Sequence, residues 1–279
     1  MSSEQEDELQ RRTLEAERDW HDKLYAANAA TAFPESAEAF RRLYLKQHLT
    51  PFCDGGWNWW GDVQHEMLHR VGNVYGKRVL DYGCGFGMLG IYLGLCGAEV
   101  WGFDLSQSAI VTANRAAVRY GLPAQFAPMD AAELNYPDGF FDLAVGFGVL
   151  HHVVKYPQSG RQLHRVLKPG GMGVFQETLW DNPFINFARR FTTVDSDAGD
   201  ALLTDRVIRS FAADFREVKL EKRHLLYMLK RLAALPPHNP AAPIKPRPFW
   251  RAVKSVDRQL LRLRPLRRYC GEVIVFLQK

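Results

Sequence analysis

Short apolar runs alternate with amphipathic stretches in the central part of the chain. The run at 79–82 leads into a turn rich in glycine, and an apolar stretch of helical length follows over 88–95. A second run at 99–104 precedes a stretch that Ser106 can cap, and a third run covers 124–129. This alternation of strand and helix patterns predicts an α/β fold.

The turn after the first run contains three glycines, Gly83, Gly85 and Gly87. Glycines at a strand-to-helix turn allow backbone conformations that a Cβ forbids, and they let a ligand approach the main chain. A dinucleotide-binding turn has the spacing G-x-G-x-x-G, whereas this chain has Met88 at the position of the third glycine. Asp81 would repel a pyrophosphate and could hold an ammonium group. These features favour S-adenosylmethionine, which has no phosphate, as the cofactor.

Two further carboxylates follow the next two strands. Asp104 comes about 20 residues after the glycine turn, at a position from which a carboxylate can accept hydrogen bonds from ribose hydroxyls. Asp130 could accept a hydrogen bond from the adenine amino group, with Leu105 and Met129 against the ring faces. The predicted cofactor-binding residues are Asp81, Gly83, Cys84, Gly85, Gly87, Asp104, Leu105, Met129, Asp130, Ala131 and Phe147.

These motifs and two later ones resemble those of the class I S-adenosylmethionine-dependent methyltransferases. The segment 81–87 resembles the first motif of that family, 141–152 its fourth strand and following turn, and 167–171 the turn before its fifth strand. The later two motifs are most similar to the branch that acts on small molecules and lipids, which includes quinone-biosynthesis C-methyltransferases. The resemblance, over roughly 77–178, implies methyl transfer to a small, hydrophobic or lipid-like acceptor with release of S-adenosylhomocysteine.

The same resemblance implies a doubly wound, Rossmann-like fold with a seven-stranded mixed sheet. Its last two strands, expected at 216–226 and 271–277, would pair antiparallel and close a methyltransferase domain over 71–279. A helical insertion at about 228–268 would separate them. Residues 1–70 show helical patterns without a strand signal, and we expect them to form an N-terminal lid.

Several side chains are candidates for the acceptor side of the site. In open α/β sheets ligands bind at the carboxyl ends of the strands, where His151, His152 and Glu177 are expected to converge. His151 and His152 are the candidate catalytic residues, because a hydroxyl or carbon acceptor must lose a proton. The predicted acceptor-binding residues are Tyr25, Trp59, Trp60 and Glu177.

Two of these residues belong to a cluster of three tryptophans, with Trp57, between glycines. The cluster could form an aromatic flap over the site, since aromatic faces attract a cationic sulfonium. It could equally wedge a loop against the core.

Composition adds few constraints. The chain has 279 residues, of which 47% are hydrophobic, so it can bury a full core. Its four cysteines show no close pairing and no Cys/His metal spacing, and the acidic N-terminus has no apolar signal core. We therefore expect a reduced, cytoplasmic protein without a metal. Its oligomeric state cannot be inferred from these patterns.

The basic charge lies in the last third of the chain. Residues 216–279 contain sixteen Lys and Arg against four acids, whereas residues 1–22 contain three arginines against eight acids. Within the basic part, a helix expected over 248–264 has an apolar stripe with basic residues off it, namely Phe249, Val253, Val256, Leu260 and Leu263 against Arg251, Lys254, Arg258 and Arg262. This pattern predicts peripheral contact with a membrane surface. Packing of the stripe on the core is the alternative.

Two other functions remain open at this point. An RNA methyltransferase would explain the basic C-terminus, but that branch has an Asn/Asp-Pro-Pro-Tyr/Phe motif after the fourth strand, where this chain has Gly148-Val-Leu-His-His. Nucleic acid is therefore disfavoured as a partner. A non-catalytic cofactor-binding scaffold is also conceivable, although the complete set of glycines and carboxylates argues against it.

Overall fold

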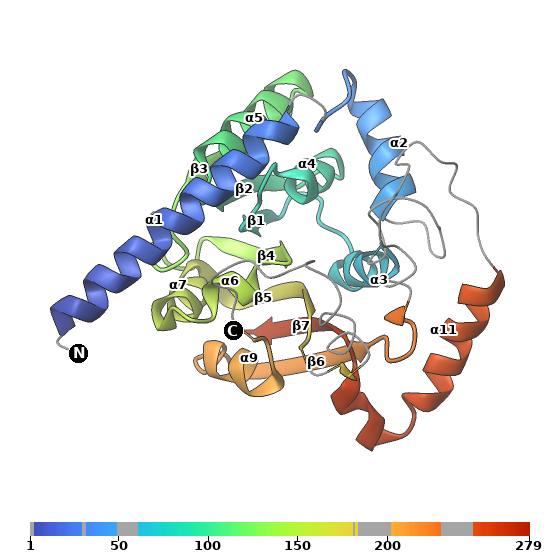
Figure 1. Cartoon of the computed structure of the whole chain (residues 1–279). Helices are drawn as coiled ribbons and strands as arrows, with labels where there is room; N and C mark the ends of the chain where they lie inside the picture. The colour runs from blue at the N-terminus through green and yellow to red at the C-terminus, as the bar shows by residue number, and fades with distance from the viewer. Residues whose placement is uncertain (1–2, 30–31, 49–60, 181, 184–201, 230–247) are drawn as a thin grey trace.

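The computed structural model describes residues 3–29, 32–48, 61–180, 182–183, 202–229 and 248–279 (Figure 1). Seven strands form one sheet in the order β3-β2-β1-β4-β5-β7-β6, and β7 runs antiparallel to both of its neighbours. The strands are β1 (Arg78–Tyr82), β2 (Glu99–Asp104), β3 (Ala124–Pro128), β4 (Phe141–Phe147), β5 (Leu167–Thr178), β6 (Glu217–Arg223) and β7 (Glu272–Gln278). The predicted doubly wound α/β fold with a seven-stranded mixed sheet is confirmed.

Helices cover both faces of this sheet. One face carries α2 (Ala37–His48), α3 (Gly61–Val71), α4 (Met88–Leu95) and α5 (Gln107–Arg119). The other carries α6 (Leu150–Val153), α7 (Pro157–Val166) and α9 (Asp205–Phe211). Val79 and Leu80 of β1 are both fully buried but belong to opposite layers, since successive side chains of a strand point to opposite faces. A strand covered on both faces therefore has a continuous apolar sequence.

The prediction for the start of the fifth strand is wrong. The segment 167–171, expected as a turn, belongs to β5, which begins at Leu167. Phe141 of β4 pairs with Leu167 and Leu143 pairs with Met172, so the register shifts between these two pairs. Gly170, with a φ of 77°, lies in the extra length of β5 that this shift creates. Glycine tolerates this left-handed conformation because it has no Cβ.

The last two strands, β6 and β7, pair antiparallel, as expected, and a long connection joins them. It contains α11 (Pro248–Leu260) and the 3-10 helix η2 (Arg264–Tyr269), so the helix predicted over 248–264 ends four residues earlier. Asp257 of α11 is only 2% exposed. Its carboxylate accepts hydrogen bonds from three successive backbone N–H groups after β6, those of Leu225, Leu226 and Tyr227. These bonds fasten α11 to the sheet edge.

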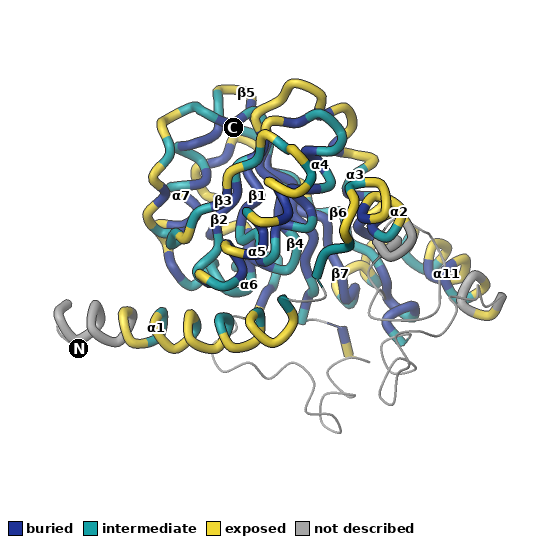
Figure 2. Tube along the Cα trace, turned by 90° about the horizontal axis from the view of Figure 1, so that it is seen from above, coloured by how far each residue is buried: buried dark blue, intermediate teal, exposed yellow. Residues whose placement is uncertain are grey.

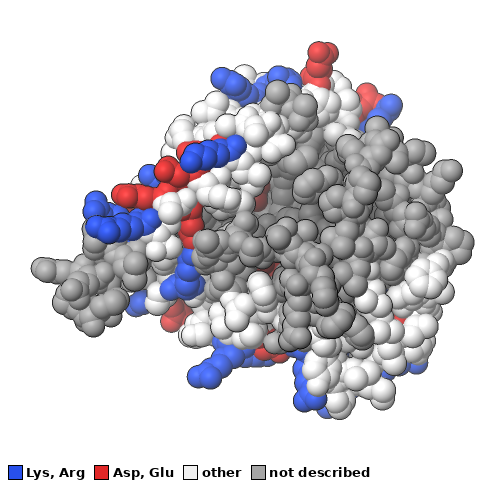
Figure 3. All heavy atoms as spheres, viewed as in Figure 1, with Lys and Arg blue, Asp and Glu red and all other residues white. Residues whose placement is uncertain are grey.

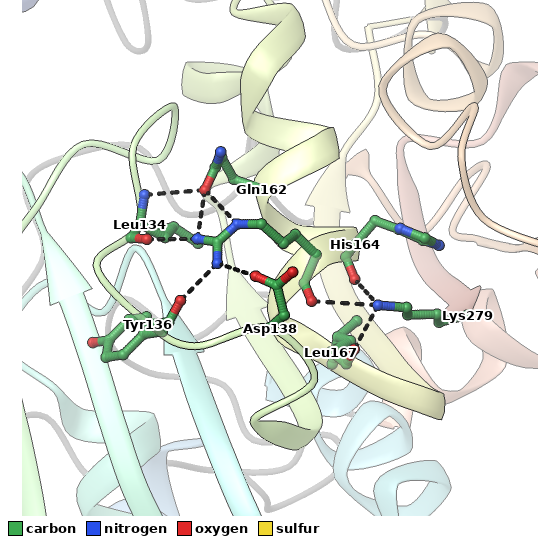
Figure 4. Close-up of polar contacts among 8 residues, drawn as sticks. Leu134, Tyr136, Asp138, Gln162, His164, Leu167 and Lys279 are labelled. Atoms are coloured by element: carbon green, nitrogen blue, oxygen red, sulfur yellow. Dashed lines mark hydrogen bonds and ion pairs between the residues drawn. The ribbon is translucent and has the colours of Figure 1, made fainter.

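The loop after β3 is fastened to α7 by one arginine (Figure 4). The guanidinium of Arg165 donates hydrogen bonds to the carbonyls of Leu134 and Tyr136 and to the side chains of Asp138 and Gln162. Nearby, Nζ of Lys279 donates to three carbonyls at the end of α7, including those of His164 and Leu167. Because the loop after β3 begins with Asp130, Arg165 also steadies one wall of the site described below.

Helix α1 (Ser3–Asn28) lies outside these two layers, along one side of the domain (Figures 1 and 2). Its outer side is exposed and carries charges of both signs (Figures 2 and 3). Its inner side contacts the turns that follow β1, β2 and β4, through Tyr25, Asp22 and Glu17 respectively. The helix therefore spans the carboxyl ends of the central strands, where ligands of doubly wound sheets bind.

Candidate functional site

The glycine turn after β1 is packed too closely for side chains. Gly83 has a φ of 63°, and a Cβ placed there would lie 2.2 Å from Cγ2 of Val149. Gly85 has a φ of 50°, and its Cβ would lie 2.7 Å from the hydroxyl of Tyr25 on α1. The turn therefore touches both α1 and the segment after β4, and larger residues at either position would displace one of them.

Asp104, at the end of β2, organises the surroundings of this turn. One carboxylate oxygen, Oδ2, accepts a hydrogen bond of 2.8 Å from the backbone N–H of Gly85. The other, Oδ1, accepts from the backbone N–H of Ser106 at 3.0 Å. Ser106 in turn caps α5, since its hydroxyl accepts from the N–H of Ala109. The predicted capping role of Ser106 is confirmed.

Asp81 lies beneath the turn rather than at its mouth. The side chain is 2% exposed, and Oδ2 accepts a hydrogen bond of 2.8 Å from the backbone N–H of Gly90 in α4. Burial raises the pKa of Asp81 to about 8, the charge of Asp104 adds to the rise, and the hydrogen bond from Gly90 opposes it. Burial likewise raises the pKa of the Cys84 thiol, which keeps it protonated and unsuited to act as a nucleophile.

A cavity lies between the turn, the ends of β2 and β4, the loop after β3, and α1. Seven of the predicted cofactor residues line it, namely Gly83, Asp104, Leu105, Met129, Asp130, Ala131 and Phe147. The four that do not are Asp81, Cys84, Gly85 and Gly87. Asp104, Asp130 and Glu17 contribute carboxylates, and no Lys or Arg of the described ranges lines the cavity. This chemistry fits a cationic ligand without phosphate groups.

Helix α1 narrows the cavity. Leu14, Glu17, His21 and Tyr25 of this helix all line it, and the remaining space measures about 100 Å³. Pockets for cofactor-sized ligands usually measure about 300–1,000 Å³. With α1 in this position, the cavity is therefore smaller than is usual for a ligand of that size.

Contacts on both sides of the cavity hold α1 in place. Asp22 accepts hydrogen bonds from the backbone N–H and the hydroxyl of Ser108 and from the hydroxyl of Ser106. Burial alone would raise the pKa of Asp22, but the hydrogen bonds from Ser106 and Ser108 outweigh it and lower the pKa. On the other side, Glu17 pairs with Lys155 of the segment after α6. The sequence predicted a lid over residues 1–70, without any signal for these two contacts.

The residues after β4 meet the end of β5 as expected, in an arrangement that the sequence did not specify. Glu177 is 2% exposed, and its Oε1 accepts from the backbone N–H groups of Val149 and Leu150, at 2.7 and 2.6 Å. Its Oε2 lies 2.9 Å from Nδ1 of His151. Glu177 thus contacts both the turn after β4 and His151, and its predicted role in acceptor binding stays a prediction.

The two histidines have different surroundings. The His151 side chain is 23% exposed, and its Cε1 lies 3.8 Å from where a Cβ on Gly148 would be. His152 lines the cavity and makes an edge-to-face contact with His21 of α1. Of the predicted acceptor-binding residues, Tyr25 lines the cavity, and Trp59 and Trp60, like Trp57, lie outside the described residues.

Comparisons with known proteins agree with this site. Residues 79–171 match a family described as a methyltransferase domain. The chain is 34% identical over 139 residues to the ubiquinone biosynthesis O-methyltransferase of Pseudomonas syringae pv. tomato, covering 45% of this chain and 59% of that protein. The protein of the same name from Bordetella bronchiseptica is also 34% identical over 139 residues, with 45% and 57% covered. The chain thus spans less than two thirds of the length of these relatives.

Solved structures share the fold at low sequence identity. The [4+2]-cyclase SpnF has a TM-score of 0.53 and 22% identity, over 87% of this chain and 92% of that one. The geranyl diphosphate C-methyltransferase of Streptomyces coelicolor A3(2) has a TM-score of 0.54 and 14% identity, over 76% and 78%. At these identities the likeness concerns the fold alone.

The fold, the acidic cavity and the family match together define the class of protein. The matched segment contains the glycine turn, Asp104, Asp130 and both histidines after β4. Residues 79–171 of the chain thus correspond to a methyltransferase domain. Its cofactor is S-adenosylmethionine, and the carboxylates of Asp104 and Asp130 are placed to meet hydroxyl and amino groups of such a ligand.

The hydrogen bonds of Asp22 lead to a prediction about cofactor exchange. The pKa of Asp22 is lowered from its usual value of 3.8, so its hydrogen bonds fully stabilise the position of α1 above pH 3.8. This stabilisation is lost as the pH falls through the lowered pKa of Asp22 in the folded protein. At neutral pH, Asp22→Asn should weaken these hydrogen bonds and let α1 open more readily. We expect S-adenosylhomocysteine to associate and dissociate about tenfold faster, as measured by surface plasmon resonance.

Asp19→Asn is the matched control, because Asp19 is exposed on the same helix. It should leave both rates unchanged. If Asp22→Asn also left both rates unchanged, α1 would not limit access to the cavity.

Proposed function

We propose that this protein transfers the methyl group of S-adenosylmethionine to a hydroxyl group of a small, hydrophobic acceptor, and that His151 accepts the hydroxyl proton. The observation that carries this proposal is the contact of the buried carboxylate of Glu177 with the partly exposed His151, in the turn that borders the cofactor cavity. In this proposal residues 1–70 act as a lid and 71–279 form the catalytic domain, with the insertion at about 228–268.

The pair fixes which ring nitrogen of His151 acts. A carboxylate accepts hydrogen bonds, so Glu177 selects the tautomer of His151 with its proton on Nδ1. Nε2 is then the basic nitrogen of the ring. Glu177 also stabilises the imidazolium that forms when Nε2 takes a proton, as a carboxylate does in other acid–base pairs.

The backbone bonds of Glu177 keep this geometry rigid. Oε1 of Glu177 accepts hydrogen bonds from the N–H groups of Val149 and Leu150 at the start of α6. The side chain of Val149 packs against Gly83 of the glycine turn. The base and the cofactor turn are therefore positioned by one connected set of contacts. Bound S-adenosylmethionine supplies an activated methyl group, and the chain contributes alignment, proton removal and, through α1, exclusion of water.

The named relatives support a hydroxyl acceptor. They are O-methyltransferases of ubiquinone biosynthesis, although they are matched over only part of their length. The fold by itself does not decide the reaction, because a [4+2]-cyclase shares it. Among the described residues no Lys or Arg lines the cavity, so RNA phosphates would meet neither of these side chains there. A non-catalytic cofactor-binding scaffold would not need the Glu177–His151 pair, because such a protein removes no proton from an acceptor.

This proposal predicts a specific loss in His151→Ala. General-base removal usually costs about 10²–10⁴-fold in rate, and we expect kcat to fall by this amount with phenolic acceptors, monitored as release of S-adenosylhomocysteine. The affinity for S-adenosylmethionine should stay within about twofold, because His151 does not line the cofactor cavity. The acid limb of the pH–kcat profile should also disappear.

His152→Ala serves as the comparison, since His152 is the neighbouring histidine on the same turn and contacts His21 of α1. It should retain the acid limb. A His151→Ala enzyme with unchanged kcat and pH profile would show that the transfer proceeds without this base.

We also propose that α11 makes peripheral contact with a lipid surface. Among the described residues, no helix has the length and hydropathy needed to cross a bilayer. On α11 and just after it, however, Val256 is 48% exposed and Leu263 is 58% exposed. In the view of Figure 3 the described atoms over α11 are mostly uncharged. Exposed apolar residues on an amphipathic helix are typical of interfacial helices.

The lipid contact predicts that Val256→Glu combined with Leu263→Glu abolishes co-sedimentation with vesicles. Both side chains are exposed, so the double variant should keep its melting temperature and cofactor affinity. Intact protein that stays in the supernatant at low salt, with neutral and with anionic vesicles, would contradict the contact.

A further inference from the structure

A groove lies along the free edge of the sheet, away from the cofactor cavity. Strand β6 forms one side, and α11 with η2 forms the other. The groove measures about 790 Å³, within the range of about 300–1,000 Å³ that is usual for small-molecule pockets. It shares no lining residue with the cofactor cavity. We call it the basic groove, because ten Lys and Arg but only four Asp and Glu line it.

The acidic residues of the basic groove are already engaged. Glu66 and Glu221 pair with Arg223, at 2.7 and 2.8 Å, and Asp205 pairs with Lys222 at 2.9 Å. The fourth, Asp257, accepts three backbone hydrogen bonds. The four carboxylates together leave an excess of positive charge, because ten Lys and Arg line the groove.

Three arginines on the other side of the groove have no acidic partner in the part of the chain that the structure describes. They are Arg258, Arg262 and Arg264. Lys254 lines the groove too and is only 6% exposed, so one ammonium group lies deep in it. Clustered positive charges repel one another and make the local electrostatic potential positive. A bound anion would reduce this repulsion.

The basic groove is separate from the apolar stripe of α11. Successive residues of an α-helix are about 100° apart, which places Val256 and Arg258 about 160° apart around α11. Lys254, Asp257 and Arg258 face the groove, and the stripe with Val256 lies on the other side of the helix. A lipid surface against the stripe would therefore not neutralise the groove.

The shape and lining of the groove indicate the class of ligand. Arginines match phosphate oxygens with paired hydrogen bonds, and a concave site admits a small ligand better than a flat bilayer. Single-stranded nucleic acid binds through stacking on aromatic side chains, and no Phe, Tyr or Trp lines the groove. We propose that the basic groove binds a small ligand with at least two phosphate groups, at a site distinct from the cofactor cavity and independent of the proposed methyl transfer.

Titration calorimetry of the full chain with inorganic pyrophosphate tests this proposal. We expect saturable binding that is weakened about tenfold or more in a double variant, Arg258→Gln with Arg262→Gln. Both arginines are exposed, so folding should be preserved, and unchanged affinity for S-adenosylhomocysteine checks this. The matched control, Arg115→Gln with Arg161→Gln, removes two exposed arginines from α5 and α7 and should bind pyrophosphate as the parent does.

Further arms distinguish other sources of phosphate. The groove double variant should still co-sediment with anionic vesicles as the parent does. Loss of vesicle binding in this variant, with no pyrophosphate binding by the parent, would make the groove a lipid headgroup surface and overturn the proposal. Tight binding of a single-stranded RNA oligomer, without pyrophosphate binding and lost in the same variant, would overturn it in favour of RNA. If the control variant lost as much pyrophosphate affinity as the groove double variant, the net charge of the protein alone would attract pyrophosphate, and the proposal would be overturned.

Discussion

The carboxylate of Asp104 joins most of the parts that surround the cofactor cavity. It holds the glycine turn through Gly85 and the start of α5 through Ser106. Ser106 then caps α5 and also reaches Asp22 of α1. One carboxylate at the end of β2 thus links the glycine turn, α5 and, through Ser106, α1. The remaining lone pairs of Asp104 face a cavity without Lys or Arg, where a ligand with hydroxyl and amino groups is favoured.

Charge is separated between the two hollows of the molecule. The cavity at the central strands has three carboxylates and no cation, whereas the basic groove at the edge of the sheet has an excess of arginine. A cationic cofactor and a phosphate-bearing ligand would each be attracted to one hollow and repelled from the other. The net charge of +5 hides this separation, because it averages over an acidic N-terminus and a basic C-terminal third.

The central fold could be predicted from the sequence because its strands are buried on both faces. β2 and α4 have the predicted bounds, since apolar runs of strand length and the residues that end them are local signals. The start of β5 could not be predicted, because Gly170 and Gly171 indicate a turn while pairing with β4 extends the strand. Strand pairing depends on residues that are distant in the sequence, so the local pattern of residues does not predict it.

The site was predictable in its residue types but not in its contacts. The motif order located Asp104 and the two histidines, but not the role of Glu177, which depends on the turn after β4 meeting the end of β5. Similarly, the apolar stripe of α11 indicated a buried or lipid-facing side. The structure instead buries Lys254 and Asp257, because the carboxylate of Asp257 satisfies backbone donors after β6.

The most direct test of the central claim is a calorimetric comparison of S-adenosylmethionine with NAD⁺ in the parent protein and in Asp104→Asn. The account predicts that S-adenosylmethionine binds the parent, that its binding weakens by about 1–3 kcal/mol in the variant, and that NAD⁺ does not bind. Binding of NAD⁺ to the parent, or equal affinity of S-adenosylmethionine for both proteins, would contradict it.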